Sequence, residues 1–233
     1  MKKAVFEQLL QARADKHSVV LVTVLDSGHQ ALVFESGDDS SGLAADVVSA
    51  ARDAMRSGRS RIFEQPDAGR TFLHVFNPPL RLFVVGAVHI TQALAPMAAM
   101  LGYAVTVIDP RRAFATTERF GEVRVLDTWP DEALAGEKLE ARSALVTLTH
   151  DPKLDDPALA AALASDAFYI GCLGSRRTHA KRLDRLSAAG FDAASLARLR
   201  GPVGLDIGAS SAAEIAISIL AQMTQSLRRG APE

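Results

Sequence analysis

Four short segments carry residues that suit anion binding or proton transfer, and the first three each follow an apolar run of strand-like composition. The first is a glycine turn, Gly86–Ile90. The second, Thr149–Asp156, combines threonine, histidine and carboxylates, a set that can move protons or bind a cation. The third, Gly171–Arg177, places glycines, a hydroxyl and two arginines before a predicted helix, which is typical of phosphate or carboxylate binding. The fourth, Gly204–Gly208, carries Asp206 between glycines.

Several of these residues also have a structural interpretation. Asp156 precedes a proline, which predicts a helix N-cap rather than a ligand contact, so His150 and Asp155 are the functional candidates of that segment. The cations from Lys181 to Arg185 could form a solvated helix face, but the glycine-rich turn before them favours anion contact. Cys172, the single cysteine, is interpreted as a small buried residue rather than a reactive thiol.

The glycine turn lies where a dinucleotide-binding loop would be expected. Gly86 supplies the tight turn, but Val88 occupies the position where a second glycine lets the backbone approach a pyrophosphate. His89 could bind a ligand or cap the helix. Asp109 follows Gly86 by roughly the 20 residues expected of a ribose-binding acid. Its alternative role is an ion pair at the strand end, because Arg111 is close in sequence.

The pattern of the chain after Leu80 predicts an α/β fold. Apolar runs that read as strands alternate with helical patterns after Leu80, and continuous apolar strands predict a parallel sheet with helices on both faces. The carboxyl ends of parallel strands share one edge, so the four segments and a fifth, Asp109–Arg112, should meet there. The predicted strands are 82–85, 104–108, 123–126, 144–148 and 168–170, and the predicted helices are about 89–101, 153–164, 175–189 and 211–228.

The first part of the chain predicts a separate small α+β domain. A helix to about Ala14 precedes strands 19–25 and 31–34, a helix over 43–55, and strands 61–63 and 71–76. The segment Asn77–Pro79 interrupts this pattern, because paired prolines exclude a continued helix or a central strand. We therefore expect domains at 1–79 and 80–233, the second of them Rossmann-like.

Composition narrows the function classes. The formal net charge of −1 gives no global attraction to nucleic acid or to an anionic membrane surface. No apolar run reaches the roughly 18 residues expected of a membrane span. One cysteine excludes an intrachain disulfide and fits a reducing compartment. We expect a cytoplasmic protein without nucleic-acid partners.

The second domain resembles the XdhC/CoxI family, the accessory factors of molybdenum hydroxylases such as xanthine dehydrogenase. The resemblance covers nearly all of residues 80–227, in the family's order. It is carried by the stretches LFVVGAVHITQALAPMAAMLGYAVTVIDPR, LVTLTHDPKLDDPAL, YIGCLGSRRTHAKR and PVGLDIGASSAAEIAISILAQ. The first domain resembles only a shortened, divergent version of the family's N-terminal domain.

The resemblance implies a Rossmann-like domain and a role in maturation. Family members carry the molybdenum cofactor (molybdopterin) as cargo and deliver it to the apo-hydroxylase, so a chaperone is expected rather than an enzyme. The resemblance also allows a sulfurtransferase as second partner and a homodimer. The residues that it implies for cofactor binding are Gly86, His89, Asp109, Arg111, Thr149, His150, Asp155, Gly171, Gly174, Ser175, Arg176, Gly204 and Asp206.

Two alternatives stay open. A NAD(P)-binding oxidoreductase could use the same cleft, although Val88 opposes it. A degenerate regulatory homologue would bind partners and no cofactor. Departures from the family pattern concern Val88 and the first domain, which lacks the family's Gly-Gly-Cys motif.

Overall fold

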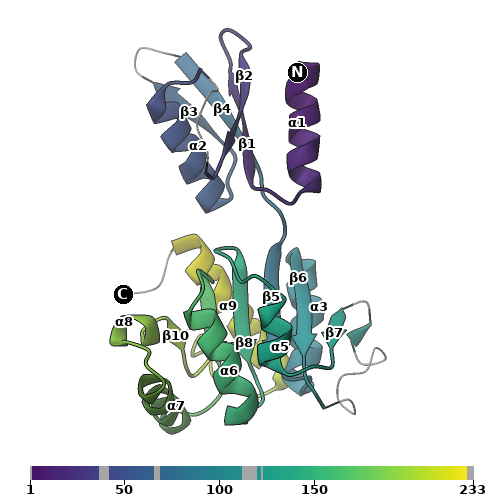
Figure 1. Ribbon diagram of the computed structural model, residues 1–233, viewed down its shortest axis with the longest axis vertical. Helices are drawn as coiled ribbons and strands as arrows, with labels where there is room; N and C mark the ends of the chain where they lie inside the picture. Colours follow the sequence, from purple (N-terminus) through teal and green to yellow (C-terminus); the bar gives the residue numbers. More distant parts are fainter. Residues whose placement is uncertain (1, 37–41, 66–68, 112–119, 122, 230–233) are drawn as a thin grey trace. The chain divides into compact units, whose positions relative to one another are not determined.

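The computed structural model describes residues 2–36, 42–65, 69–111, 120–121 and 123–229. These residues form two compact units, Met1–Pro78 and Pro79–Glu233. Each unit is built around its own sheet, shown in Figure 1.

The first unit is an antiparallel sheet with a helix on each face. The strand order is β2-β1-β4-β3, and β1 pairs with both β2 and β4. Alternation along β1 divides the core, since Val20 and Val22 pack toward α2 while Val19 and Leu21 pack toward α1. The elements are α1 (Lys3–Ala14), β1 (Val19–Val24), β2 (Gln30–Phe34), α2 (Ala45–Ser57), β3 (Arg61–Gln65) and β4 (Gly69–Phe76).

The second unit is a parallel six-stranded sheet in the order β10-β9-β8-β5-β6-β7. The predicted fold class is confirmed. The chain starts in the middle with β5, runs outward through β6 and β7, and returns to the other side of β5 with β8. The strand order therefore reverses between β5 and β8, which is where ligands of doubly wound folds bind. The strands are β5 (Leu80–Val85), β6 (Tyr103–Ile108), β7 (Arg124–Leu126), β8 (Ser143–Thr147), β9 (Tyr169–Cys172) and β10 (Leu199–Arg200).

Helices cover both faces of this sheet (Figure 1). Leu82 and Val84 of β5 pack toward α3 and α9, whereas Phe83 and Val85 pack toward α5 and α6. The short elements α5, α8 and β10 were not predicted, because segments of two to six residues carry little periodicity. The helices are α3 (His89–Met100), α5 (Pro130–Ala135), α6 (Pro152–Leu163), α7 (Arg176–Ala188), α8 (Ala193–Leu196) and α9 (Ala212–Arg229).

Candidate functional site

The Gly86 turn is pressed against the end of β8. Gly86 has φ +111°, a conformation that side chains rarely adopt, and its N–H donates to the Ile108 carbonyl at 2.9 Å. A Cβ atom at Gly86 would lie 2.7 Å from Cγ2 of Thr149. The Thr91 hydroxyl closes the turn by donating to the Gly86 carbonyl. Thr149 therefore packs directly against the Gly86 turn.

Asp109 holds the same turn from the end of β6. Its carboxylate is fully buried and accepts the Ala87 N–H at 2.8 Å on Oδ2. The Arg111 side chain donates to both carboxylate oxygens, at 2.8 Å and 2.7 Å, and the Arg111 N–H donates at 3.0 Å. Burial by itself would raise the pKa of Asp109, but these hydrogen bonds outweigh burial and lower it. Asp109 is thus an ionised group that fixes the turn.

His89 and Val88 form the start of α3. Val88 occupies the N-cap position with φ −96° and provides no side-chain cap. His89 is the first residue of the helix, and its side chain is exposed. The imidazole is therefore accessible at the carboxyl edge of the sheet, as a ligand contact requires.

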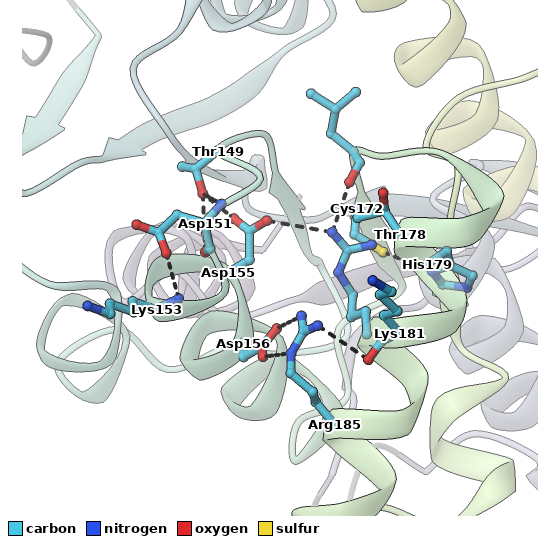
Figure 2. Close-up of polar contacts among 12 residues, drawn as sticks. Thr149, Asp151, Lys153, Asp155, Asp156, Cys172, Thr178, His179, Lys181 and Arg185 are labelled. Atoms are coloured by element: carbon cyan, nitrogen blue, oxygen red, sulfur yellow. Dashed lines mark hydrogen bonds and ion pairs between the residues drawn. The ribbon is translucent and has the colours of Figure 1, made fainter.

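The loop after β8 is built around Thr149 (Figure 2). Its hydroxyl donates to Oδ1 of Asp155 at 2.6 Å and accepts the Asp151 N–H at 3.1 Å. His150, between them, is exposed and has φ +64°, a left-handed conformation uncommon outside glycine. Such conformations cluster at functional sites, where the surrounding structure maintains them.

Asp155 forms a buried pair with a cation from the next helix. Arg182 Nη2 lies 3.6 Å from Asp155 Oδ2, both side chains are 2% exposed, and the same nitrogen donates to the Leu173 carbonyl at 2.8 Å. Burial raises the pKa of Asp155, whereas the Thr149 hydrogen bond and the charge of Arg182 oppose that rise. Two nitrogens of Arg182, Nε and Nη1, have no hydrogen-bond partner among the described residues.

The N-cap predicted at Asp156 was wrong. The helix begins one turn earlier, and Asp151 is the N-cap, with its side chain accepting the Lys153 N–H at 3.0 Å. Pro152 rather than Pro157 occupies the start of the helix. Asp156 points instead toward Arg185 of α7, which donates to its two oxygens at 2.6 Å and 2.9 Å (Figure 2). Pro157 is the sixth residue of α6 and lies inside the helix, beyond the first turn where the N–H groups have no intrahelical acceptor, so it does not mark the start.

The segment from Gly171 to Arg176 begins with residues packed in and after β9 and ends at the exposed start of α7. Gly171 is buried in β9, where a Cβ atom would lie 2.6 Å from a methyl group of Val203. Gly174 follows the strand with φ +139°. Ser175 is the N-cap of α7 and accepts the Thr178 N–H at 3.2 Å. Arg176 is the first helical residue and is exposed.

The loop before α9 is held by the helix that follows. The Gly204 N–H donates to the side chain of Gln222 at 2.9 Å. Ser211 and Glu214 form the predicted capping box, and the backbone hydrogen bonds from Ser211 and Ser210 lower the pKa of Glu214 to about 2. Asp206 is exposed in this loop, outside the capping hydrogen bonds.

A hollow of about 330 Å³ lies between the start of α6 and the exposed face of α7. We call it the α6–α7 hollow, and it includes two of the predicted site residues, His150 and Asp155. His89, Arg176 and Asp206 do not line it. The lining residues are His150, Pro152, Asp155, Arg177, Thr178, Lys181, Arg182 and Arg185.

The four cations of the α6–α7 hollow were not predicted individually as site residues. Arg177, Lys181, Arg182 and Arg185 recur at helical spacing, so they share one face of α7. This helical spacing was the sequence signal that could have identified them as one group. A run of charges is usually a solvated face, and only the structure shows that this face is turned toward α6 and that Arg182 is buried.

Cys172 is buried as predicted. Its Sγ atom lies 3.7 Å from Nδ1 of His179 (Figure 2). Burial raises the pKa of the thiol to about 11, although the nearby Arg182 charge opposes the rise. The thiol is therefore protonated near neutral pH and is a poor nucleophile.

Two features are absent from the described part of the chain. No group of three or more His, Cys, Asp or Glu side chains there is arranged to hold a metal ion. None of the described helices is long and apolar enough to cross a membrane.

The fold and the site define a Rossmann-type α/β domain with a cationic hollow at the carboxyl edge of its sheet. Residues 82–223 match the model of the XdhC Rossmann domain. The chain belongs to the XdhC family, as its sequence predicted.

Curated relatives share this domain. The chain is 32% identical over 148 residues to the molybdenum cofactor insertion chaperone PaoD of Escherichia coli, an alignment that covers 64% of the chain and 40% of PaoD. It is 31% identical over 159 residues to a probable xanthine dehydrogenase subunit of Bacillus subtilis, covering 68% and 46%. The uncharacterized protein YqeB of E. coli is 34% identical over 161 residues, covering 69% and 30%. The matched segments thus span less than half of each relative.

A solved structure resembles nearly the whole chain. A crystal structure described as a xanthine dehydrogenase from Bacillus halodurans is similar with a TM-score of 0.69 and 25% identity. The similarity covers 97% of this chain and 66% of that one.

Proposed function

We propose that this protein is an accessory factor for a molybdenum hydroxylase, which binds molybdopterin at the carboxyl edge of its parallel sheet and delivers it to the apoenzyme. Its family and the names of its relatives support this role. The single observation that carries the binding step is the α6–α7 hollow, because a transferable anionic cargo needs a cationic, partly dry site.

The predicted site residues take distinct parts in this proposal. Gly86, Asp109 and Arg111 would act indirectly, by fixing the β5–α3 turn at the same edge of the sheet. His150 lines the α6–α7 hollow and would contact the cargo there, while the buried Asp155 would hold Arg182 in place. Arg176, exposed at the start of α7, would contact the cargo outside the hollow. His89 and Asp206, both exposed, would contact the pterin end of the cargo from neighbouring loops.

The arrangement of Asp109 favours this role over a NAD(P)-dependent oxidoreductase. A ribose-binding acid must present an oxygen to the sugar. Here both carboxylate oxygens accept hydrogen bonds from Arg111 or Ala87, and the side chain is 0% exposed.

Retention of the cofactor tests the proposal directly. Purified protein is incubated with molybdopterin and gel-filtered, and the protein peak is oxidised and assayed for pterin fluorescence. We expect pterin in the protein peak at a stoichiometry near one, and about a tenfold weaker retention by Arg177→Ala, which removes a cation of the hollow and roughly one charge-assisted hydrogen bond. Lys138→Ala removes a charge from an exposed lysine that does not line the hollow, and it serves as the control. A protein peak without pterin would contradict cofactor carriage and favour a regulatory homologue.

Delivery needs a second measurement. A loaded sample is mixed with an apo-hydroxylase, and the activity of that enzyme is followed over time. Activation faster than that produced by the same amount of free molybdopterin is expected, because a carrier protects and orients its cargo. Equal rates would limit the protein to storage.

A further inference from the structure

The α6–α7 hollow has a local excess of positive charge. Its lining contains four cations, Arg177, Lys181, Arg182 and Arg185, and one carboxylate, Asp155. A second carboxylate, that of Asp156, is bonded to Arg185 from outside the lining. Two positive charges therefore remain without a counter-charge.

The uncompensated cations lie in the hollow itself. Arg177 and Lys181 have no ion-pair partner within the part of the chain that the structure describes, and both side chains are exposed. They come from successive turns of α7, so they face the same opening. Exposed cations without an internal ion pair can bind a ligand without first breaking such a pair.

Arg182 forms the floor of the hollow and has donors to spare. It is 2% exposed, its Nη2 contacts the Leu173 carbonyl and the Asp155 carboxylate, and the guanidinium also interacts with the Cys172 thiol. Nε and Nη1 have no hydrogen-bond partner among the described residues. Buried donors are nearly always satisfied, and leaving them unpaired is costly. This cation therefore suits a site that a ligand completes.

Two helix starts converge on the hollow. Residues His150 and Pro152 belong to the start of α6, while Arg177 and Thr178 belong to the first turn of α7. Helices of 12 and 13 residues carry partial positive charge at these ends, which favours an anion. The backbone dipoles and the side chains thus favour the same sign of ligand charge.

From this arrangement we infer that the α6–α7 hollow binds a terminal phosphate group, the dianion of a phosphate monoester. A carboxylate would leave one of the two excess charges uncompensated, whereas a monoester carries close to two negative charges at neutral pH. Guanidinium groups bind phosphate oxygens in pairs, and Arg177 and Arg182 approach from the rim and from the floor. The inference rests on the proposed function only for the identity of the molecule that carries the phosphate.

Calorimetry with methyl phosphate, which has no pterin, tests the site by itself. We expect one equivalent to bind the full chain, and methyl sulfate, a monoanion of similar shape, to bind more weakly. Lys181→Met and Arg177→Met should each weaken methyl phosphate binding about tenfold, the effect of one charge-assisted hydrogen bond. Neither change disturbs a buried pair, so both variants should fold.

Lys138→Met provides the matched control, because it removes the same charge from an exposed lysine outside the hollow. Its affinity for methyl phosphate should equal that of the wild type. The inference is overturned if methyl phosphate does not bind, or if the Lys181→Met and Lys138→Met variants bind it equally well.

Competition identifies the source of the phosphate. Methyl phosphate is added to protein already loaded with molybdopterin, and displacement of pterin would assign the hollow to the phosphate end of the cargo. If adenosine monophosphate binds the hollow and molybdopterin does not compete with it, the site binds a nucleotide phosphate instead. Either result supports a phosphate site. A protein that binds methyl phosphate but retains no pterin would therefore refute the proposed function and leave this inference intact.

Discussion

Replacing Asp109 by asparagine removes the charge that fixes the Gly86 turn. In the wild type, the two carboxylate oxygens accept four hydrogen bonds, one from Ala87 and three from Arg111. Asparagine keeps one acceptor oxygen, and its amide group faces two of these donors instead of accepting from them. The change therefore leaves donors beside the turn without an acceptor.

The magnitude follows from the bonds that are lost. Hydrogen bonds to a charged group contribute about 1.5–3 kcal/mol each, so two of them set an upper range of about 3–6 kcal/mol. The Arg111 side chain is 41% exposed and can return to water, which reduces this loss. We expect Asp109→Asn to lower the free energy of unfolding of the second unit by roughly 2–4 kcal/mol.

Urea unfolding followed by tryptophan fluorescence measures this quantity. Trp129 is the single tryptophan of the chain and lies at the start of α5 in the second unit, so its emission reports that unit. The control is Asp166→Asn, the same substitution at an exposed carboxylate, which should change stability by less than about 0.5 kcal/mol. The slope of unfolding free energy against urea concentration should be the same for Asp109→Asn as for the wild type.

The pH dependence gives a second criterion. The pKa of Asp109 is lowered in the folded state because hydrogen bonds from Arg111 and Ala87 outweigh the opposing effect of burial. Its stabilisation is therefore complete above the unfolded-state pKa of about 4 and is lost as the pH falls through the lower folded-state pKa. The difference between wild type and Asp109→Asn should shrink in acid. A stability loss below about 1 kcal/mol at neutral pH, or a difference that stays constant in acid, would refute the role assigned to this carboxylate.

Two further substitutions test the local geometry. Gly86→Ala should destabilise the second unit by about 1–3 kcal/mol, because the φ of Gly86 is positive and an added Cβ would press on Thr149. The control Gly136→Ala should have little effect, because the nearest atom to its added Cβ is 3.8 Å away, and equal unfolding midpoints for the two variants would contradict the close approach at Gly86. Asp151→Ala should cost about 1 kcal/mol as the loss of an N-cap, and Asp156→Ala should cost less than that as the loss of a partly exposed ion pair. The reverse order in thermal unfolding would restore the cap predicted from the sequence.

The sequence determined the elements of the second unit that are long and strongly patterned. Continuous apolar runs predicted β5, β6 and β8, because a strand buried on both faces has no polar alternation to preserve. Glycine and polar residues after those runs predicted an edge at which a site could form. Family motifs then identified the XdhC domain, which the comparison over residues 82–223 confirmed.

Local patterns left the start of α6 undecided. Both Asp151 and Asp156 precede a proline, so either could have capped the helix. The tertiary structure selects Asp151, because Thr149 anchors the preceding turn and Asp156 is then one helical turn further on, within reach of Arg185.

Only the tertiary structure decided the composition of the candidate site. Arg176 and Arg177 are adjacent in sequence and chemically equivalent, yet a helix turns about 100° per residue, so one lines the α6–α7 hollow and the other does not. Likewise Arg182 and Asp155 are 27 positions apart, and nothing local predicts that they form a buried pair. The sequence thus determined the longer strands and helices and the turns between them, because these depend on residues close in the chain. The packing of α7 against α6 determined which cations face an anion, because that depends on contacts between segments far apart.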